Sequence, residues 1–160
     1  MSEKIWIERE TIHDYLARLA GVAPQHAWGE TSYFYNPGRR LARGAYFATI
    51  KDHDGAHDQA SALSRVGVWR LSLGVSQAAY VERFGPPPRR PSKGGVVDGQ
   101  WDFEALDVLT PHPVYGWMAW VAVLTPSTDT WIEQCLPLIT DAHKRARIKF
   151  ESRSQPKLSR

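Results

Sequence analysis

The stretch GVWRLSLGV, residues 67–75, decides the fold class of this chain. Its large apolar side chains stand at every second position, which is the spacing of a β-strand with one face on a hydrophobic core. The predicted core side consists of Trp69, Leu71, Leu73 and Val75, and the opposite side consists of Val68, Arg70, Ser72 and Gly74. We therefore expect a strand that points Arg70 and Ser72 away from the main core.

The segments around this strand predict further strands and a helix near each end. Residues 31–36 and 44–51 are β-prone and flank an Asn-Pro-Gly turn at 36–38, and residues 117–124 form an apolar strand. Apolar residues recur at helical spacing over 12–20, and residues 130–133 form a capping box that starts a last helix. Ser76 and Asp102 are expected to cap two short helices. The order of elements predicts an α+β fold, a small antiparallel β-sheet packed by N- and C-terminal helices, with a helical or loop insert around 76–116.

A length of 160 residues suits one domain with a proper core. We expect a single α+β domain over residues 1–150 and a basic, disordered tail over residues 151–160. From His143 onward seven Lys and Arg residues face one acid, so this end holds +6 while the rest of the chain holds −3. The single cysteine, Cys135, excludes an internal disulfide framework.

Several classes of protein lack support in the sequence. No apolar run reaches the roughly 18 residues of a membrane helix, and the first ten residues carry charges rather than a signal segment. We therefore expect a cytoplasmic protein with no membrane partner. The motifs of serine hydrolases, P-loop nucleotide hydrolases and Rossmann dehydrogenases are not present, and no cofactor is predicted.

Three short motifs resemble those of a known family. They are the Phe-Ala-Thr-Ile segment at 47–50, the Arg-Leu-x-x-Gly-Val segment at 70–75 and the Pro-His-Pro-Val-Tyr-Gly segment at 111–116. Together they resemble an uncharacterised bacterial family of actinomycete type over roughly residues 5–148. A looser resemblance to the MmcQ/YjbR-like proteins rests on a wider pattern, in which a helix near each end encloses segments 28–29, 33–35, 47–50, 68–71 and 120–123. The resemblance implies a small antiparallel sheet packed by helices, without a known activity. Relatives often carry Asn at the position of Ser72, so if this side chain helps to hold a ligand, the resemblance implies a different ligand here.

His112 is the candidate catalytic residue. It stands between Pro111 and Pro113, which stiffen the backbone and suit the display of a general base or a ligand contact. The alternative is a loop histidine that packs and hydrogen-bonds locally. Tyr115 lies three residues further along and is expected to point into the same space.

Arg70 and Ser72 are the candidate polar contacts on the strand. If a helix or loop covers their side of the sheet, a buried arginine needs a carboxylate from the protein or from a ligand. The alternative is an open face with solvated side chains. With Tyr115, the predicted ligand-binding set is completed by two aromatic walls, Trp28 and Trp117.

Residues 52–58 combine carboxylate and imidazole side chains, which are common metal ligands. Their spacing fits no known metal loop, and Gly55 interrupts any helix that would present both histidines. We predict no metal, and we keep as the weaker alternative a site formed by Asp52, His53, His57 and Asp58.

These observations favour a small-molecule-binding domain with a pocket between the sheet and the insert. It would act as an acid–base enzyme or as a binding protein of specialised metabolism, with a small-molecule ligand of anionic character as its partner. The alternative is a nucleic-acid-binding or protein-interaction module that uses the basic C-terminal tail. Substrate, catalytic competence and oligomeric state stay open at this point.

Overall fold

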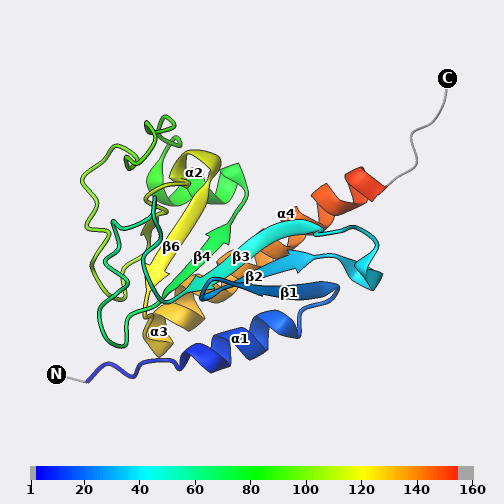
Figure 1. The fold of residues 1–160 in the computed structure, drawn as a ribbon, viewed down its shortest axis with the longest axis horizontal. Helices are drawn as coiled ribbons and strands as arrows, with labels where there is room; N and C mark the ends of the chain where they lie inside the picture. The colour runs from blue at the N-terminus through cyan, green and yellow to red at the C-terminus, as the bar shows by residue number, and fades with distance from the viewer. Residues whose placement is uncertain (1–2, 155–160) are drawn as a thin grey trace.

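The computed structural model describes residues 3–154, and its centre is one six-stranded antiparallel sheet (Figure 1). The strands follow the order β1-β2-β3-β4-β6-β5 across the sheet. Their bounds are β1 Val22–Ala27, β2 Glu30–Tyr35, β3 Ala45–Lys51, β4 Arg70–Gly74, β5 Thr110–Pro111 and β6 Trp120–Leu124. This arrangement confirms the predicted α+β fold.

Two helices cover one face of the sheet, which we call the helix face. They are α1 (Arg9–Ala17) and the long α4 (Leu136–Ser154), and their apolar sides pack on Leu71, Leu73 and neighbouring strand residues. A short helix α3 (Thr128–Thr130) and a π-helical turn η3 (Trp131–Cys135) lead into α4. The hydrophobic core therefore lies between the sheet and these two helices, as the alternation in β4 predicts.

The entry into α4 differs from the predicted capping box at Thr130. Ser127 caps the helix instead, since its hydroxyl accepts a hydrogen bond from the Thr130 backbone N–H at 3.2 Å. Pro137 has no N–H to bond to a carbonyl one turn earlier, and the wider turn η3 lies directly before it. The distortion expected from Pro137 thus takes the form of a π-turn within a continuous helical segment.

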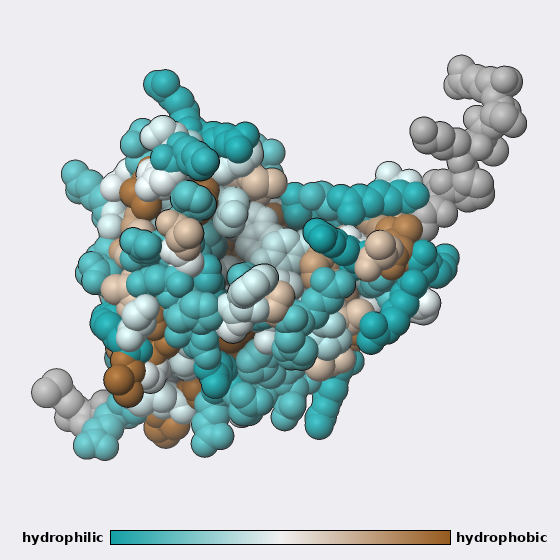
Figure 2. All heavy atoms as spheres, in the orientation of Figure 1, coloured by the Kyte–Doolittle hydropathy of each residue, from teal (hydrophilic) through white to brown (hydrophobic). Residues whose placement is uncertain are grey.

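Loops cover the opposite face of the sheet, which we call the loop face. The covering segments are residues 52–69, which join β3 to β4, and residues 85–119, which follow the short helix α2 (Gln77–Phe84) and include the 3₁₀ helix η2 (Gly116–Met118). Figure 2 shows this side of the molecule and the hollow between the loop-rich part and the sheet. Ser76 caps α2 as predicted, because its hydroxyl accepts from the Ala79 N–H at 3.1 Å.

Three sequence predictions fail locally. Residues 102–109 form turns instead of the helix expected after Asp102. Residues 116–118 form η2, so the strand expected from Trp117 begins at Trp120. Residues 22–27 form β1, a strand that was not predicted, and Pro24 is tolerated there because β1 lies at the edge of the sheet.

The C-terminal end is helical further than predicted. Helix α4 continues through Ser154, so residues 151–154 of the predicted tail belong to a helix, and the rest of that tail lies outside the described residues. Within residues 3–154, no helix combines the length and the apolar character that crossing a membrane would need.

Candidate functional site

A cavity of about 470 Å³ lies on the loop face of the sheet. Strand residues form its floor, and the loops after β3 and β5 form its walls. The lining side chains come from the strands (Glu30, Tyr46, Thr49, Lys51, Arg70, Trp120) and from the loops (Ala56, His57, Asp58, His112, Tyr115, Met118). This volume falls within the usual range of small-molecule sites.

The pairing of β3 with its neighbours explains how its residues reach the cavity. Thr49 lies opposite Ser72, and Lys51 lies opposite Arg70, so all four share the loop face. The β2–β3 register shifts at Tyr33 and Phe34, which leaves Phe47 as an extra residue. Phe47 and Ala48 are both fully buried in the helix-face core. This β-bulge is the reason that Tyr46 and Thr49, three residues apart, both line the cavity.

Arg70 and Asp58 form a buried ion pair beneath the loop. Arg70 is 1% exposed. Its Nη1 donates to Asp58 Oδ1 at 2.9 Å and to Ser61 Oγ at 3.1 Å, while its Nη2 donates to Asp58 Oδ2. Lys51 Nζ lies 3.3 Å from the same carboxylate. Burial alone would raise the pKa of Asp58, but the hydrogen bonds and charge of Arg70 hold that pKa well below its usual range.

The carboxylate partner of Arg70 is therefore the protein's own Asp58, one of the two sources that the sequence left open. The pair ties residues 52–69 to the floor of the sheet. Both terminal nitrogens of Arg70 are occupied, so its guanidinium positions the loop and contributes little free charge to a ligand.

Two polar atoms on the loop side of β4 have no hydrogen-bond partner among the described residues. They are Arg70 Nε and Ser72 Oγ, and both are fully buried. Nearly all buried polar atoms in proteins are hydrogen-bonded, so such a pair needs an explanation. Because residues 70 and 72 stand on one side of a strand, the loop face carries both an unpaired donor and an unpaired hydroxyl.

His112 is held as a neutral ring with a defined tautomer. Its Nδ1 accepts hydrogen bonds from the backbone N–H groups of Val114 and Tyr115, both at 3.1 Å. A ring nitrogen that accepts carries no proton, so the proton lies on Nε2. Burial, with the charge of Arg70 acting in the same direction, lowers the pKa of His112 well below 6.5.

Trp120 and Tyr46 give the cavity an aromatic wall. Their ring centroids lie 4.7 Å apart with an interplanar angle of 34°. The indole of Trp120 lies directly against Gly74 of β4, where an added Cβ would meet two indole carbons at 2.7 Å. A glycine at this strand position thus lets the indole approach the backbone closely.

The structure brings three of the predicted site residues together. Arg70, His112 and Tyr115 line the same cavity, and the rings of His112 and Tyr115 lie 5.1 Å apart. Ser72 lies on the same face but is closed off beneath the cavity at 0% exposure.

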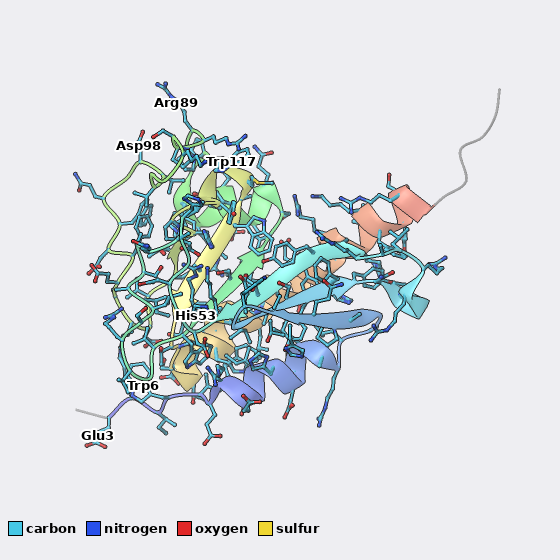
Figure 3. The ribbon with its side chains drawn as sticks, in the orientation of Figure 1. Glu3, Trp6, His53, Arg89, Asp98 and Trp117 are labelled. Atoms are coloured by element: carbon cyan, nitrogen blue, oxygen red, sulfur yellow. The ribbon has the colours of Figure 1, made fainter. Side chains whose placement is uncertain are left out.

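The two predicted tryptophan walls lie elsewhere. Trp28 is 92% exposed in the two-residue β1–β2 turn, where Trp28 and Gly29 both have positive φ. Trp117 belongs to η2 and lines a different hollow with Pro86–Pro88 and Arg145. Figure 3 places Trp117 near Arg89, far from His53 at the other end of the loop side. Tyr46 and Trp120 take the place of these walls.

The weaker metal candidates do not converge on one point. Asp52 bonds to Arg9 at 2.8 Å and to His53 at 3.0 Å, whereas Asp58 bonds to Arg70. Over residues 3–154, no group of three or more His, Cys, Asp or Glu side chains is placed to hold a metal ion.

Several cavity residues could not be predicted from the sequence, because their position depends on how the strands pair. Thr49 and Lys51 follow from pairing the predicted strand 44–51 against 67–75 in antiparallel register, which the sequence alone left undetermined. Tyr46 requires the bulge as well. Trp120 belongs to the predicted apolar strand 117–124 and is buried at 8% exposure, but it lies on the cavity side of the sheet.

Comparison with known proteins places the chain in a family without assigning an activity. The model of a family of unknown function, DUF6194, matches residues 7–155. This match confirms the expectation of an uncharacterised family and shows no link to the MmcQ/YjbR-like proteins. Neither the curated proteins nor the solved structures contain a match.

Proposed function

We propose that this chain, which belongs to the DUF6194 family, binds a small organic molecule in the cavity on the loop face of its sheet. The main observation behind the proposal is that Arg70, His112 and Tyr115 line one cavity of about 470 Å³. These residues come from two segments some forty positions apart. A concave pocket with apolar walls and a few fixed polar groups is the usual form of a small-molecule site.

The buried polar atoms support the same proposal. A protein designed only for stability would place apolar side chains where Arg70 and Ser72 stand, since buried polar groups without partners cost free energy. An ion pair and a neutral histidine beneath loops are typical of a preorganised binding site.

Within this proposal His112 is a hydrogen-bond donor. A general base needs an unprotonated nitrogen that faces the substrate, but Nδ1 is occupied by two backbone donors and Nε2 holds the proton. A neutral imidazole that polarises a carbonyl is a known catalytic arrangement, so a reaction at this site would use His112 as an electrophile.

The test is to block the mouth of the cavity. Ala56→Trp places an indole there, and Ala42→Trp places the same side chain on an exposed residue of the β2–β3 connection. A pool of aromatic amides, carboxylates and phenols is titrated into each protein while backbone amide NMR shifts are recorded. We expect saturable shifts at the cavity residues in the wild type and A42W, and their loss in A56W. Hits that are insensitive to A56W would contradict the proposal.

We propose nucleic-acid binding as a second candidate function, supported by a basic surface that forms away from the cavity. Two basic groups distant in sequence meet there: Arg40 lies 5.1 Å from the Phe150 ring, and Arg153 Nη1 lies 3.4 Å from the Gly44 carbonyl oxygen. Figure 1 shows the end of α4 beside the β2–β3 connection. The sequence analysis assigned this role to the tail, whereas the contacts favour the α4 surface.

Charge reversal with a matched control tests the second candidate. R39E/R43E removes four units of charge from this surface, and R89E/K93E removes four units from the Pro-rich loop at the other end of the molecule (Figure 3). If the surface binds phosphates, the first variant weakens binding to a 20-base-pair DNA duplex at least tenfold and lowers the salt dependence, while the second changes it less than threefold. An equal loss of DNA binding in both variants would show that only the net charge of the protein matters, which would contradict a specific binding surface.

A distant relationship to the MmcQ/YjbR-like proteins is a separate proposal. It is supported by the order of the β-prone segments between two terminal helices and by an antiparallel sheet packed by an N-terminal and a C-terminal helix, as the resemblance implies. An experimental structure of this chain whose strand order fails to superimpose on a YjbR-like structure would overturn it.

A further inference from the structure

The charged groups around the cavity are already balanced within the protein. Lys51 and Arg70 are positive, and Glu30 and Asp58 are negative. Asp58 is bonded to both cations, and Glu30 Oε1 accepts from the Thr49 hydroxyl at 2.6 Å. An ion that leaves water needs a partner of opposite charge, and here both cations share Asp58 while Glu30 supplies the second negative charge at the cavity. This balance disfavours an anionic or cationic ligand.

The polar group best placed to bind a ligand is uncharged. His112 lines the cavity, its Nδ1 is occupied, and its remaining ring donor is Nε2–H. None of the hydrogen bonds found within residues 3–154 uses this N–H. A neutral N–H donor matches a neutral oxygen acceptor such as a carbonyl.

The aromatic rings of Trp120 and Tyr46 favour a flat ligand. Trp120 and Tyr46 bring two aromatic rings to the cavity lining, with centroids 4.7 Å apart and planes tilted by 34°, and the Trp120 indole packs closely on Gly74. Aromatic rings placed in this way favour planar ligands in offset or tilted stacking. Met118, which is 46% exposed, adds an adaptable apolar side chain at the same cavity.

We propose that the ligand of this cavity is an uncharged, planar molecule whose carbonyl-type oxygen accepts a hydrogen bond from His112 Nε2–H. The inference rests on the proposed small-molecule function and specifies its ligand class. It replaces the anionic ligand expected from the sequence, because the cation that this expectation needed, Arg70, is paired with Asp58.

Three probes of equal size and shape test the ligand class. Benzamide is neutral, benzoate is an anion and benzamidinium is a cation, and all three share one flat ring. Binding is measured from backbone amide NMR shifts at the cavity residues. A ligand of this size has an expected dissociation constant of about 10 mM, which such titrations resolve. We expect benzamide to bind at least fivefold more tightly than either ion.

A matched pair of variants tests the role of His112. In His112→Asn the side-chain oxygen still accepts the two backbone N–H groups, but the Nε2–H donor is removed. His26→Asn makes the same change on β1, outside the cavity. We expect H112N to weaken benzamide binding about fivefold and H26N to leave it unchanged.

The outcomes separate this inference from the proposed function. Tighter binding of benzoate or benzamidinium at the cavity would keep the small-molecule site and overturn the neutral ligand class. Equal benzamide affinity in H112N and H26N would overturn the role of His112. If none of the three probes shifts the cavity resonances at concentrations of about 50 mM, both the ligand class and the proposed function fail.

Discussion

The two faces of one sheet are buried by different physical means. On the helix face, α1 and α4 press apolar side chains onto Leu71 and Leu73, and nearly every contact there is hydrophobic. On the loop face, two irregular segments cover Arg70 and Ser72, and the first of these segments is tied down by Asp58. The same strand, β4, supplies both sets of residues by simple alternation.

Because of this difference, the two faces respond differently when a side chain is removed. Apolar packing is spread over many side chains, so the helix face loses stability in proportion to the volume removed. The polar face depends on a few directed bonds, and removing one partner leaves the other buried and uncompensated. The loop face therefore carries the polar groups on which the proposed ligand site depends.

Asp58→Ala is expected to have the largest effect on the free energy of unfolding. It leaves the Arg70 guanidinium buried at 1% exposure without a carboxylate, at a cost of about 3–5 kcal/mol. Urea denaturation measures the loss. The double variant Arg70→Met/Asp58→Leu removes both charges and should lie within about 1 kcal/mol of the wild type. A double variant as unstable as D58A would show that the ion pair itself stabilises the fold.

Leu71→Ala is the corresponding test on the helix face. Leu71 is fully buried, and its truncation should cost about 2–5 kcal/mol, through lost burial and a new cavity. No charge is left unpaired, so benzamide binding per folded molecule should be unchanged. A loss of binding in the folded L71A protein would show that the two faces are coupled.

Gly74→Ala is expected to have an intermediate effect that is confined to the loop face. The new Cβ would lie 2.7 Å from two indole carbons of Trp120, so the indole must move, which costs about 1–3 kcal/mol. Near-ultraviolet circular dichroism reports the altered packing of Trp120 against Tyr46. An unchanged spectrum at unchanged stability would contradict the close contact between Gly74 and Trp120.

Ser72→Ala is expected to have the smallest effect on stability. Its hydroxyl has no hydrogen-bond partner among the described residues, so its removal should change the free energy of unfolding by less than about 0.5 kcal/mol or stabilise the protein. Thermal unfolding in parallel with the wild type measures this change. A loss above about 1 kcal/mol would show that Ser72 Oγ is hydrogen-bonded in solution.

The contrast between the faces also explains how far the sequence could be interpreted. The strand at 67–75 predicted both faces of β4 correctly, because alternation is a local property of the chain. Likewise, the Ser76 cap depends on near neighbours and is confirmed, and the helix predicted over 12–20 is present, although α1 ends at Ala17.

The parts of the site that were not predicted from the sequence depend on contacts between residues distant in the chain. The pairing of Asp58 with Arg70 is made by an irregular loop with no periodicity to read. Tyr46 reaches the cavity through a bulge at Phe47 that has no sequence signature here. Trp28 and Trp117 were predicted from residue type alone, and local turn geometry carries both of them away from the cavity.

The most direct test of the account is the protonation state of His112 in solution. Ring nitrogens of ¹⁵N-labelled histidine are followed by NMR from about pH 8 to about pH 5, with and without benzamide. We predict an unprotonated Nδ1 and a protonated Nε2 at pH 6.5, where a free imidazole is half protonated, because burial and the charge of Arg70 lower the pKa well below that value. We also predict a shift of the Nε2–H signal when benzamide binds. A His112 ring that titrates near pH 6.5, or that carries its proton on Nδ1, would contradict a loop face built to present a neutral donor.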